Sequence, residues 1–320
     1  MLDQQSTVAE PRLQRRFIIS VLAGALLFVL PLLAHWMSWY LPDRRELGPA
    51  SAAVRFEPVE LDPAGFGALE LGGAWRVSAD DPRFGGISAL AIDHEGLLAL
   101  ADSGVVIRLP RPAGGQSTAL LDELPDGPAD GRFRRNRDSE ALLRDPMGRG
   151  WWVAFETHHE LWLYDRTFDK ALARIPLGRN RWPANRGVEG LAGDDPALLL
   201  FPENARSVIR LQPPEIVESP IAGDIAEISD AAAIGSGGVL AVERRLTALG
   251  FATALVRLER SAGGYRVAGR IPLTLGPFDN VEALAIEPRA AGGARLWLMT
   301  DDNYQPPFRS LLVALDVPAG

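Results

Sequence analysis

The stretch SEALLRDPMGRGWWVAFET, residues 139–157, decides the fold. Two apolar runs of strand length flank a turn made of proline, glycine and charged residues. The aromatic residues of the second run favour a strand over a helix. Two further runs, ELWLYD at 160–165 and KALARIPL at 170–177, follow after short breaks. The segment therefore predicts a unit of four short antiparallel strands.

The same pattern recurs along the chain. In 139–157, Glu140 opens the first apolar run and Glu156 closes the second. Four other copies hold these two positions with Ser88 and Asp102, Glu189 and Glu203, Asp230 and Glu243, and Glu282 and Asp301. A repeat of about 40 to 50 residues with about four strands per unit is typical of a β-propeller. We predict an all-β propeller of five blades, with six blades as the alternative.

Closure of the ring requires a strand from outside the repeats. The last unit, 281–317, supplies only three clear strands. The run ALELGGAWRVS at 68–78 precedes the first unit, so we expect it to supply the missing outer strand. If VRFEPVEL at 54–61 is also a strand, it would add a sixth, partial blade.

The N-terminus has a different character. Residues 17–41 are almost uninterruptedly apolar, and a helix needs about 20 such residues to cross a bilayer. Arginines precede this run, which predicts a cytoplasmic N-terminus at 1–16 and a transmembrane signal anchor at 17–41. Residues 42–53 read as a linker and 54–320 as the propeller domain. We expect a single-pass protein of a bacterial inner membrane with its propeller in the periplasm; the alternative is secretion after signal cleavage.

Composition narrows the possible functions. The chain has no cysteine, which excludes disulfides and thiolate metal sites. Its formal net charge of -8 argues against nucleic acid as a partner, because nucleic-acid binding requires a basic face. The expected partners are a small anionic or ester substrate and the membrane, through residues 17–41, with a protein partner as a further option.

The acidic positions of each repeat are expected to share one face. In an antiparallel pair, the start of the first strand lies beside the end of the second. The loops between blades lie on the same face and are rich in arginine. The predicted arginine rim comprises Arg132, Arg134, Arg135, Arg137, Arg179, Arg181 and Arg186. The sequence thus predicts a ring of carboxylates at the mouth of a central channel, with arginines around it.

Such a ring can be a metal site or a structural device. Ca²⁺ takes six to eight oxygen ligands, and acids from several strands can supply them. The expected ligands are Glu140, Glu189, Glu243, Glu282, Asp301 and Asp302. The alternative is structural: the acids accept hydrogen bonds from backbone N–H groups of neighbouring blades, or pair with the arginines.

Candidates for catalysis and substrate binding come from the same face. Guanidinium groups match phosphate or carboxylate, so Arg135, Arg186 and Arg245 are expected to bind substrate. The catalytic candidates are Glu156, Glu203 and His158. The sequence contains no G-x-S-x-G elbow and no H-E-x-x-H motif, which argues against serine hydrolases and zincins.

Several motifs also carry a family resemblance. The runs RDSEALLRDP, NRGVEGLA, LAVERR and DNVEALAIEP resemble the phytase-like family of exported bacterial proteins, described as esterase-like activity of phytase. The resemblance covers about 84–317. The matching positions are Glu140, Glu156, Glu189, Glu203, Glu243, Arg245, Asp279, Asn280, Glu282, Asp301, Asp302 and Asn303. It implies a β-propeller and an ester or phosphoester hydrolase.

Three hypotheses of function follow. The first is a membrane-anchored, periplasm-facing hydrolase that uses Ca²⁺ and acts on a phosphoester or carboxylic ester. The second is a noncatalytic propeller that binds a ligand or protein at the same face. The third is a lactonase-type hydrolase, which differs from the first only in its substrate.

Overall fold

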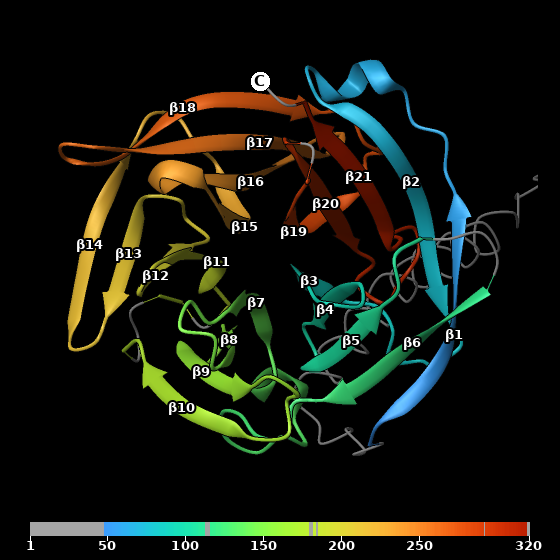
Figure 1. Cartoon of the computed structure of the whole chain (residues 1–320), viewed down its shortest axis with the longest axis horizontal. Coiled ribbons are helices and arrows are strands. Elements are labelled where there is room, and N and C mark those ends of the chain that lie inside the picture. Colours follow the sequence, from blue (N-terminus) through green and yellow to red (C-terminus); the bar gives the residue numbers. More distant parts are fainter. Residues whose placement is uncertain (1–47, 113–115, 179–181, 184, 291, 319–320) are drawn as a thin grey trace, which may run out of the picture.

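The computed structural model describes residues 48–112, 116–178, 182–183, 185–290 and 292–318. These residues form β-sheets arranged around a central axis (Figure 1), and every strand pair is antiparallel except the short parallel pair of β14 with β18. Three short 3-10 turns interrupt the strands: η1 (Pro63–Phe66), η2 (Arg134–Asn136) and η3 (Gly235–Gly237). The prediction of an all-β propeller is confirmed.

The strands follow one another in antiparallel groups. The first group contains β3 (Ile87–Ile92), β4 (Leu97–Ala101), β5 (Val105–Leu109) and β6 (Gln116–Glu123). The second contains β7 (Ser139–Arg144), β8 (Gly150–Phe155), β9 (Glu160–Asp165) and β10 (Ala171–Pro176). The third contains β11 (Val188–Asp194), β12 (Ala197–Pro202), β13 (Ser207–Gln212) and β14 (Glu215–Ala222).

The remaining strands complete the ring. The fourth group contains β15 (Glu227–Ile234), β16 (Gly238–Thr247), β17 (Gly250–Ser261) and β18 (Gly264–Leu273). The fifth contains β19 (Asn280–Pro288), β20 (Ala294–Asp301), β21 (Leu311–Val317) and β2 (Glu70–Ala79). The pairing of β2 with β21 confirms that an N-terminal strand completes the last group.

The N-terminal strand β1 (Ala50–Pro58) pairs with both β2 and β6. It therefore bridges the outer edges of the fifth and first groups instead of starting a group of its own. It begins inside the segment 42–53 that the sequence predicts as a linker.

The first strands of the groups line the centre of the ring. β3 contacts β7, β7 contacts β11, β11 contacts β15, β15 contacts β19, and β19 contacts β3. These strands lie nearest the central axis (Figure 1). Each of these strands is an edge of its sheet, so five short edges lie next to one another around the axis.

Hydrophobic cores lie between neighbouring groups. Between the first and second groups, Leu98 and Val106 meet Trp151 and Tyr164. Between the fifth and first groups, the buried Trp297 packs with residues of β3 and β4. Full burial of one such side chain stabilises the fold by about 1.5–3 kcal/mol. Apolar residues on both faces of strands such as β4, β8 and β12 thus supply the contacts between blades.

One hydrogen bond closes the ring between residues far apart in sequence. The backbone N–H of Gly86 donates to Asp302 Oδ1 at 2.9 Å. Gly86 has φ +58°, and a Cβ there would lie 2.3 Å from the ring of Tyr304. Only glycine permits this close approach.

Residues 17–41, the predicted membrane anchor, lie outside the described residues. Among the residues that are described, the structure has no helix with the length and apolar character needed to span a membrane.

Candidate functional site

The two acidic positions of each repeat lie on one face, which we call the mouth face. It carries the starts of β3, β7, β11, β15 and β19 and the ends of β4, β8, β12, β16 and β20. Glu140 lies near the start of β7, beside Glu156 just after the end of β8. Glu189 and Glu203 have the same relation in β11 and β12. The antiparallel register therefore brings acids distant in sequence together.

Three carboxylates converge at one point of the mouth face. One oxygen each from Asp138, Glu140 and Glu156 lies within 4.8 Å of the others. We call these residues the carboxylate triad. Asp138 is buried and accepts a hydrogen bond of 2.9 Å from the hydroxyl of Thr157. The sequence prediction placed Glu140 and Glu156 in the site and missed Asp138, although its position two residues before Glu140 puts both on one side of an extended chain.

The triad is electrostatically unfavourable when it stands alone. Burial, followed by the charges of Glu189 and Asp138, raises the pKa of Glu156 to about 10. Burial and Asp102 raise the pKa of Asp138 to about 6. Burial and Glu189 also raise the pKa of Glu140 well above its ordinary value. Repulsion among close, desolvated carboxylates explains these shifts.

The donor set fits a hard divalent cation. Ca²⁺ prefers carboxylate oxygens and accepts six to eight of them in flexible geometry. Two of the three triad members, Glu140 and Glu156, are sequence-predicted site residues. A cation at this point would offset the repulsion that raises the three pKa values. Three carboxylates leave further coordination positions open to water or substrate oxygens.

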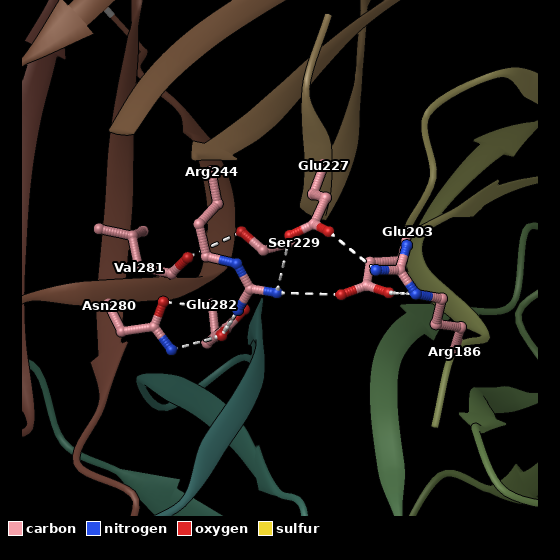
Figure 2. Close-up of polar contacts among 8 residues, drawn as sticks. All are labelled: Arg186, Glu203, Glu227, Ser229, Arg244, Asn280, Val281 and Glu282. Carbon is pink, nitrogen blue, oxygen red and sulfur yellow. Dashed lines mark hydrogen bonds and ion pairs between the residues drawn. The ribbon is translucent and has the colours of Figure 1, made fainter. Parts of the chain in front are cut away.

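An arginine lies between acids of three neighbouring groups of strands (Figure 2). Arg244 pairs with Glu282, and its Nη2 lies 3.2 Å from Glu203 Oε1. Oε2 of Glu227 lies 4.0 Å from the same Nη2. Burial alone would lower the pKa of Arg244, but Glu282 and the other carboxylates raise it above its ordinary value. Arg244 is thus a fixed positive charge in the acidic mouth.

Figure 2 also shows how Arg186 joins this network. Its Nη2 donates to Glu227 at 3.2 Å, and its Nε lies 3.5 Å from Glu203. Asn280 donates to Glu282 at 2.6 Å. The predicted residues Arg186, Glu203 and Glu282 are therefore brought together.

Glu189 connects the two acidic groups. Burial, then Glu282 and Glu203, raise its pKa well above the ordinary value. Glu189 in turn raises the pKa of Glu140 and of Glu156. Burial and Glu227 raise the pKa of Glu203. The acids of the second and third groups thus form one coupled cluster.

A second arginine lies on the other side of the channel. Arg134 Nη2 donates to Asp102 at 2.5 Å, and its guanidinium lies 4.6 Å from the centre of the Tyr304 ring. Burial, then Asp102, raise the pKa of Asp301 well above its ordinary value. Among the arginines of the predicted rim, Arg134 thus contacts an acid of the mouth face. Arg179 and Arg181 lie outside the described residues.

Other acids of the repeat accept hydrogen bonds from backbone N–H groups. Asp302 accepts hydrogen bonds from Gly86 N and from Tyr304 N, at 2.9 and 3.1 Å. Glu243 accepts one from Ala226 N at 2.7 Å and pairs with Arg270. Asp302 and Glu243, both predicted metal ligands, are therefore not brought to the triad.

The histidines lie at the edge of the site. The Nε2 of His158 lies 2.8 Å from Asn136 Oδ1. His159 is buried, and its Nε2 lies 3.1 Å from the carbonyl oxygen of Arg186. The two rings thus have separate hydrogen-bond partners.

The remaining predicted arginines occupy the surface near the mouth. Arg135 lies over the ring of Phe133, 5.1 Å from its centre. Arg245 is 55% exposed and lies 3.8 Å from Asp224. Strand alternation directs Arg244 into the acidic network and its neighbour Arg245 away from it. The sequence prediction of Arg245 therefore missed the adjacent arginine that contacts the acids.

A cavity of about 640 Å³ opens beside this network. It is bounded by the β12–β13 turn, the loop between β14 and β15, and the end of β16. Its charged lining residues are Arg186, Arg206, Asp224, Glu227, Arg244 and Arg245. An anionic group could contact several guanidinium groups there.

Taken together, the fold and the site define a β-propeller with an acidic, arginine-flanked mouth. The sequence pattern of the Phytase-like family, described as "Esterase-like activity of phytase", matches residues 82–304. The chain belongs to this family. A comparison with curated proteins gave no match.

Solved structures with a similar fold include enzymes of different chemistry. Glutaminyl cyclase of Myxococcus xanthus is 15% identical with a TM-score of 0.49, over 73% of this chain and 92% of that one. The PQQ-bound aldose sugar dehydrogenase of Streptomyces coelicolor is 14% identical with a TM-score of 0.44, over 85% of this chain and 100% of that one.

Proposed function

We propose that this protein is a metal-dependent hydrolase of a phosphoester or carboxylic ester, acting at the mouth face. The convergence of Asp138, Glu140 and Glu156 carries the proposal. Membership of the phytase-like family supports the same class of chemistry. A lactone, as a cyclic ester, belongs to the same substrate class.

The triad would hold the cation, with Ca²⁺ as the proposed metal. A bound divalent ion polarises an ester or phosphoryl oxygen and lowers the pKa of water. Glu189 raises the pKa of Glu140, and Glu282 raises the pKa of Glu189, so both acids add to the negative potential of the site. The chain itself thus supplies a preorganised anionic cradle whose repulsion a cation offsets.

Other side chains would orient substrate and carry protons. Arg186 and Arg245 line the cavity and would bind an anionic group of the substrate. Glu203 lies beside Arg186 and Arg244, so it is the proposed proton acceptor. His158 is a second candidate for proton transfer near the triad.

A noncatalytic binding propeller is the second candidate. The observation in its favour is that Asp302 and Glu243 hold backbone N–H groups, and Arg244 neutralises part of the acid cluster. On this account the same cavity would bind a ligand or a protein without turning it over.

Activity of glutamine variants distinguishes the two. We would assay the full-length protein against a panel of phosphate monoesters, carboxylic esters and lactones, with Ca²⁺ present. Glu156→Gln and Glu203→Gln are expected to lose at least about a hundredfold in kcat/KM, in line with typical general acid–base contributions. The control Glu95→Gln changes an exposed acid in the turn between β3 and β4, on the face opposite the mouth, and should retain activity. Equal activity in all variants would contradict the hydrolase proposal.

We further propose a five-bladed ring, anchored in a membrane. The grouping of strands and the circle of first strands support five blades. The apolar run 17–41 supports a single-pass anchor in a bacterial inner membrane, with the propeller in the periplasm. Detection of the mature N-terminus by mass spectrometry tests this against secretion after cleavage.

A further inference from the structure

Exposed apolar side chains gather at one place on the mouth face. Leu246 is 73%, Leu249 88% and Phe278 48% exposed. We call these three residues the apolar tip. Leu246 and Leu249 belong to the hairpin that joins β16 to β17, and Phe278 lies in the loop before β19. Large apolar groups exposed together mark an interaction site more often than single ones do.

Aromatic rings from neighbouring loops pack against the apolar tip. Phe308 lies edge-on to Phe278, with ring centres 6.0 Å apart. It also lies 6.4 Å from Phe251 at the start of β17. The loops before β19 and before β21 thus pack against the hairpin. The apolar tip is therefore held in place by rings packed beneath it.

The other exposed large apolar residues do not form a comparable surface. Among the described residues, Leu120, Leu172, Ile216 and Val217 belong to the outer strands β6, β10 and β14. Met147, 65% exposed, lies in the turn between β7 and β8, on the face opposite the mouth. Of the two ends of the propeller, the mouth face therefore carries the larger group of exposed apolar side chains.

The chain enters the domain on this same face. Ala50 of β1 lies opposite Leu121, close to the mouth-face end of β6. The carbonyl oxygen of Gly48 accepts a hydrogen bond of 2.7 Å from Arg83, in the loop that leads to β3. The apolar run ends at residue 41, and residues 42–47 span at most about 3.5 Å each, or roughly 20 Å in all. An anchor at 17–41 would therefore hold the mouth face close to the bilayer.

Two exposed arginines lie beside the apolar tip. Arg245 and Arg206 are exposed and line the cavity that Leu246 also lines. Cationic side chains next to apolar ones are the usual composition of interfacial membrane contacts, with the cations at headgroup level.

We propose that the mouth face docks on the surface of an anionic phospholipid bilayer, with the apolar tip inserted among the lipids. The inference rests on the proposed membrane anchor and is independent of the proposed hydrolysis. Two attachments, the chain entry at Gly48 and the apolar tip, would fix the orientation of the domain. The channel mouth then opens toward the membrane surface.

Single-cysteine labelling of the full-length chain tests this directly, because the natural chain has no cysteine. Leu249→Cys places a polarity-sensitive fluorophore on the tip, and Met147→Cys places one on the opposite face. Both positions are exposed, so neither change disturbs the core. Each labelled protein is reconstituted, one chain per disc, in nanodiscs of phosphatidylethanolamine and phosphatidylglycerol.

At position 249 we expect blue-shifted emission that nitroxides on the lipid acyl chains quench at least about twofold, since inserted side chains lie about 5–10 Å into the interface. At position 147 we expect water-like emission without quenching. Water-like emission at both positions, with the chain in the disc, would overturn the docking alone. A blue shift at 249 without lipid quenching would assign the tip to a protein contact and also overturn it. If the chain does not enter discs, the proposed membrane anchor and the proposed docking are both overturned. The hydrolase proposal is unaffected, because the ester assay tests it separately.

Discussion

Asp230 on β15 accepts a hydrogen bond from the backbone N–H of Leu284 on β19, at 2.7 Å. Its other oxygen accepts one from its own neighbour, Ala231 N, also at 2.7 Å. Asp230 is buried, and burial raises its pKa well above the ordinary value. An acid from one group of strands thus satisfies a backbone donor of the next. The repeat therefore uses the same residue type for adhesion at some positions and for the triad at others.

Loss of this contact should destabilise the ring. In Asp230→Ala both backbone donors lose their partner, and each unsatisfied buried donor costs about 1–3 kcal/mol. Asp230→Asn keeps one acceptor oxygen and should cost less. Urea unfolding of the purified protein measures both. The control Asp224→Asn, at an 83% exposed acid, should stay within about 0.5 kcal/mol of the parent protein. A fully stable Asp230→Ala would contradict the adhesive role.

The sequence predicts the fold well because each strand and turn of a propeller is determined by residues close together in the chain. Continuous apolar runs of strand length, with turns at short intervals, identify strands such as β8 and β12 without tertiary information. The repeat of acids at strand ends then predicts that Glu140 and Glu156 meet, since antiparallel pairing requires it. The extra strand β2 follows from the missing strand of the last unit.

The use of each acid could not be predicted, because it depends on small differences in backbone register. Glu140 is a member of the triad and lies at the irregularity between Ser139 and Ala141. In the fourth group the irregularity lies between Ile228 and Asp230, so Ser229 takes the position that Glu140 has in the second group. The predicted Asp230 lies one residue later and bonds to a backbone N–H. The direction of a side chain at such an irregularity is set by the neighbouring group of strands, which the pattern of residue types does not reveal.

Arg244 and Arg245 offer a matched pair for testing the acid network. Arg244→Gln leaves the carboxylate of Glu282 without its cation and Glu203 with Arg186 alone, and loss of a buried charge partner typically costs about 3–5 kcal/mol. Arg245→Gln removes a guanidinium that is 55% exposed, and should cost less than about 1 kcal/mol. Denaturant unfolding curves without added metal give both values. Similar stability of the two variants would show that Arg244 is not required to balance the acids.

Acid sensitivity should depend on Asp145. Burial by itself would raise its pKa, but hydrogen bonds from Arg149 and from the indole of Trp152 lower it below the ordinary 3.8. A lowered folded-state pKa stabilises the fold above about pH 3.8, and this contribution is lost as the pH falls through the folded value. The parent protein should therefore lose more stability than Asp145→Asn below about pH 3.8. Parallel stability curves for both proteins in that range would refute this.

The triad should determine the metal content of the protein. Glu140→Gln removes one carboxylate charge and one strong ligand oxygen, so the variant should bind Ca²⁺ at least about tenfold more weakly, as single-ligand losses commonly do. Isothermal titration with CaCl₂ after chelator treatment measures this affinity. Glu243→Gln is the matched control, because Glu243 pairs with Arg270 away from the triad. Equal losses in both variants would argue for a diffuse effect of negative charge.

The most direct measurement is the metal content and melting temperature of the full-length protein, purified without chelator, then treated with EDTA and titrated with Ca²⁺. The account predicts about one tightly bound divalent cation per chain. Its removal should lower the melting temperature, since saturating ligand at a hundredfold excess over Kd stabilises a fold by about 2.7 kcal/mol. Re-addition of Ca²⁺ should restore the parent value, and Glu140→Gln should show both effects more weakly. Absence of bound metal, with a melting temperature indifferent to EDTA and Ca²⁺, would contradict the central claim that the carboxylate triad is a cation site.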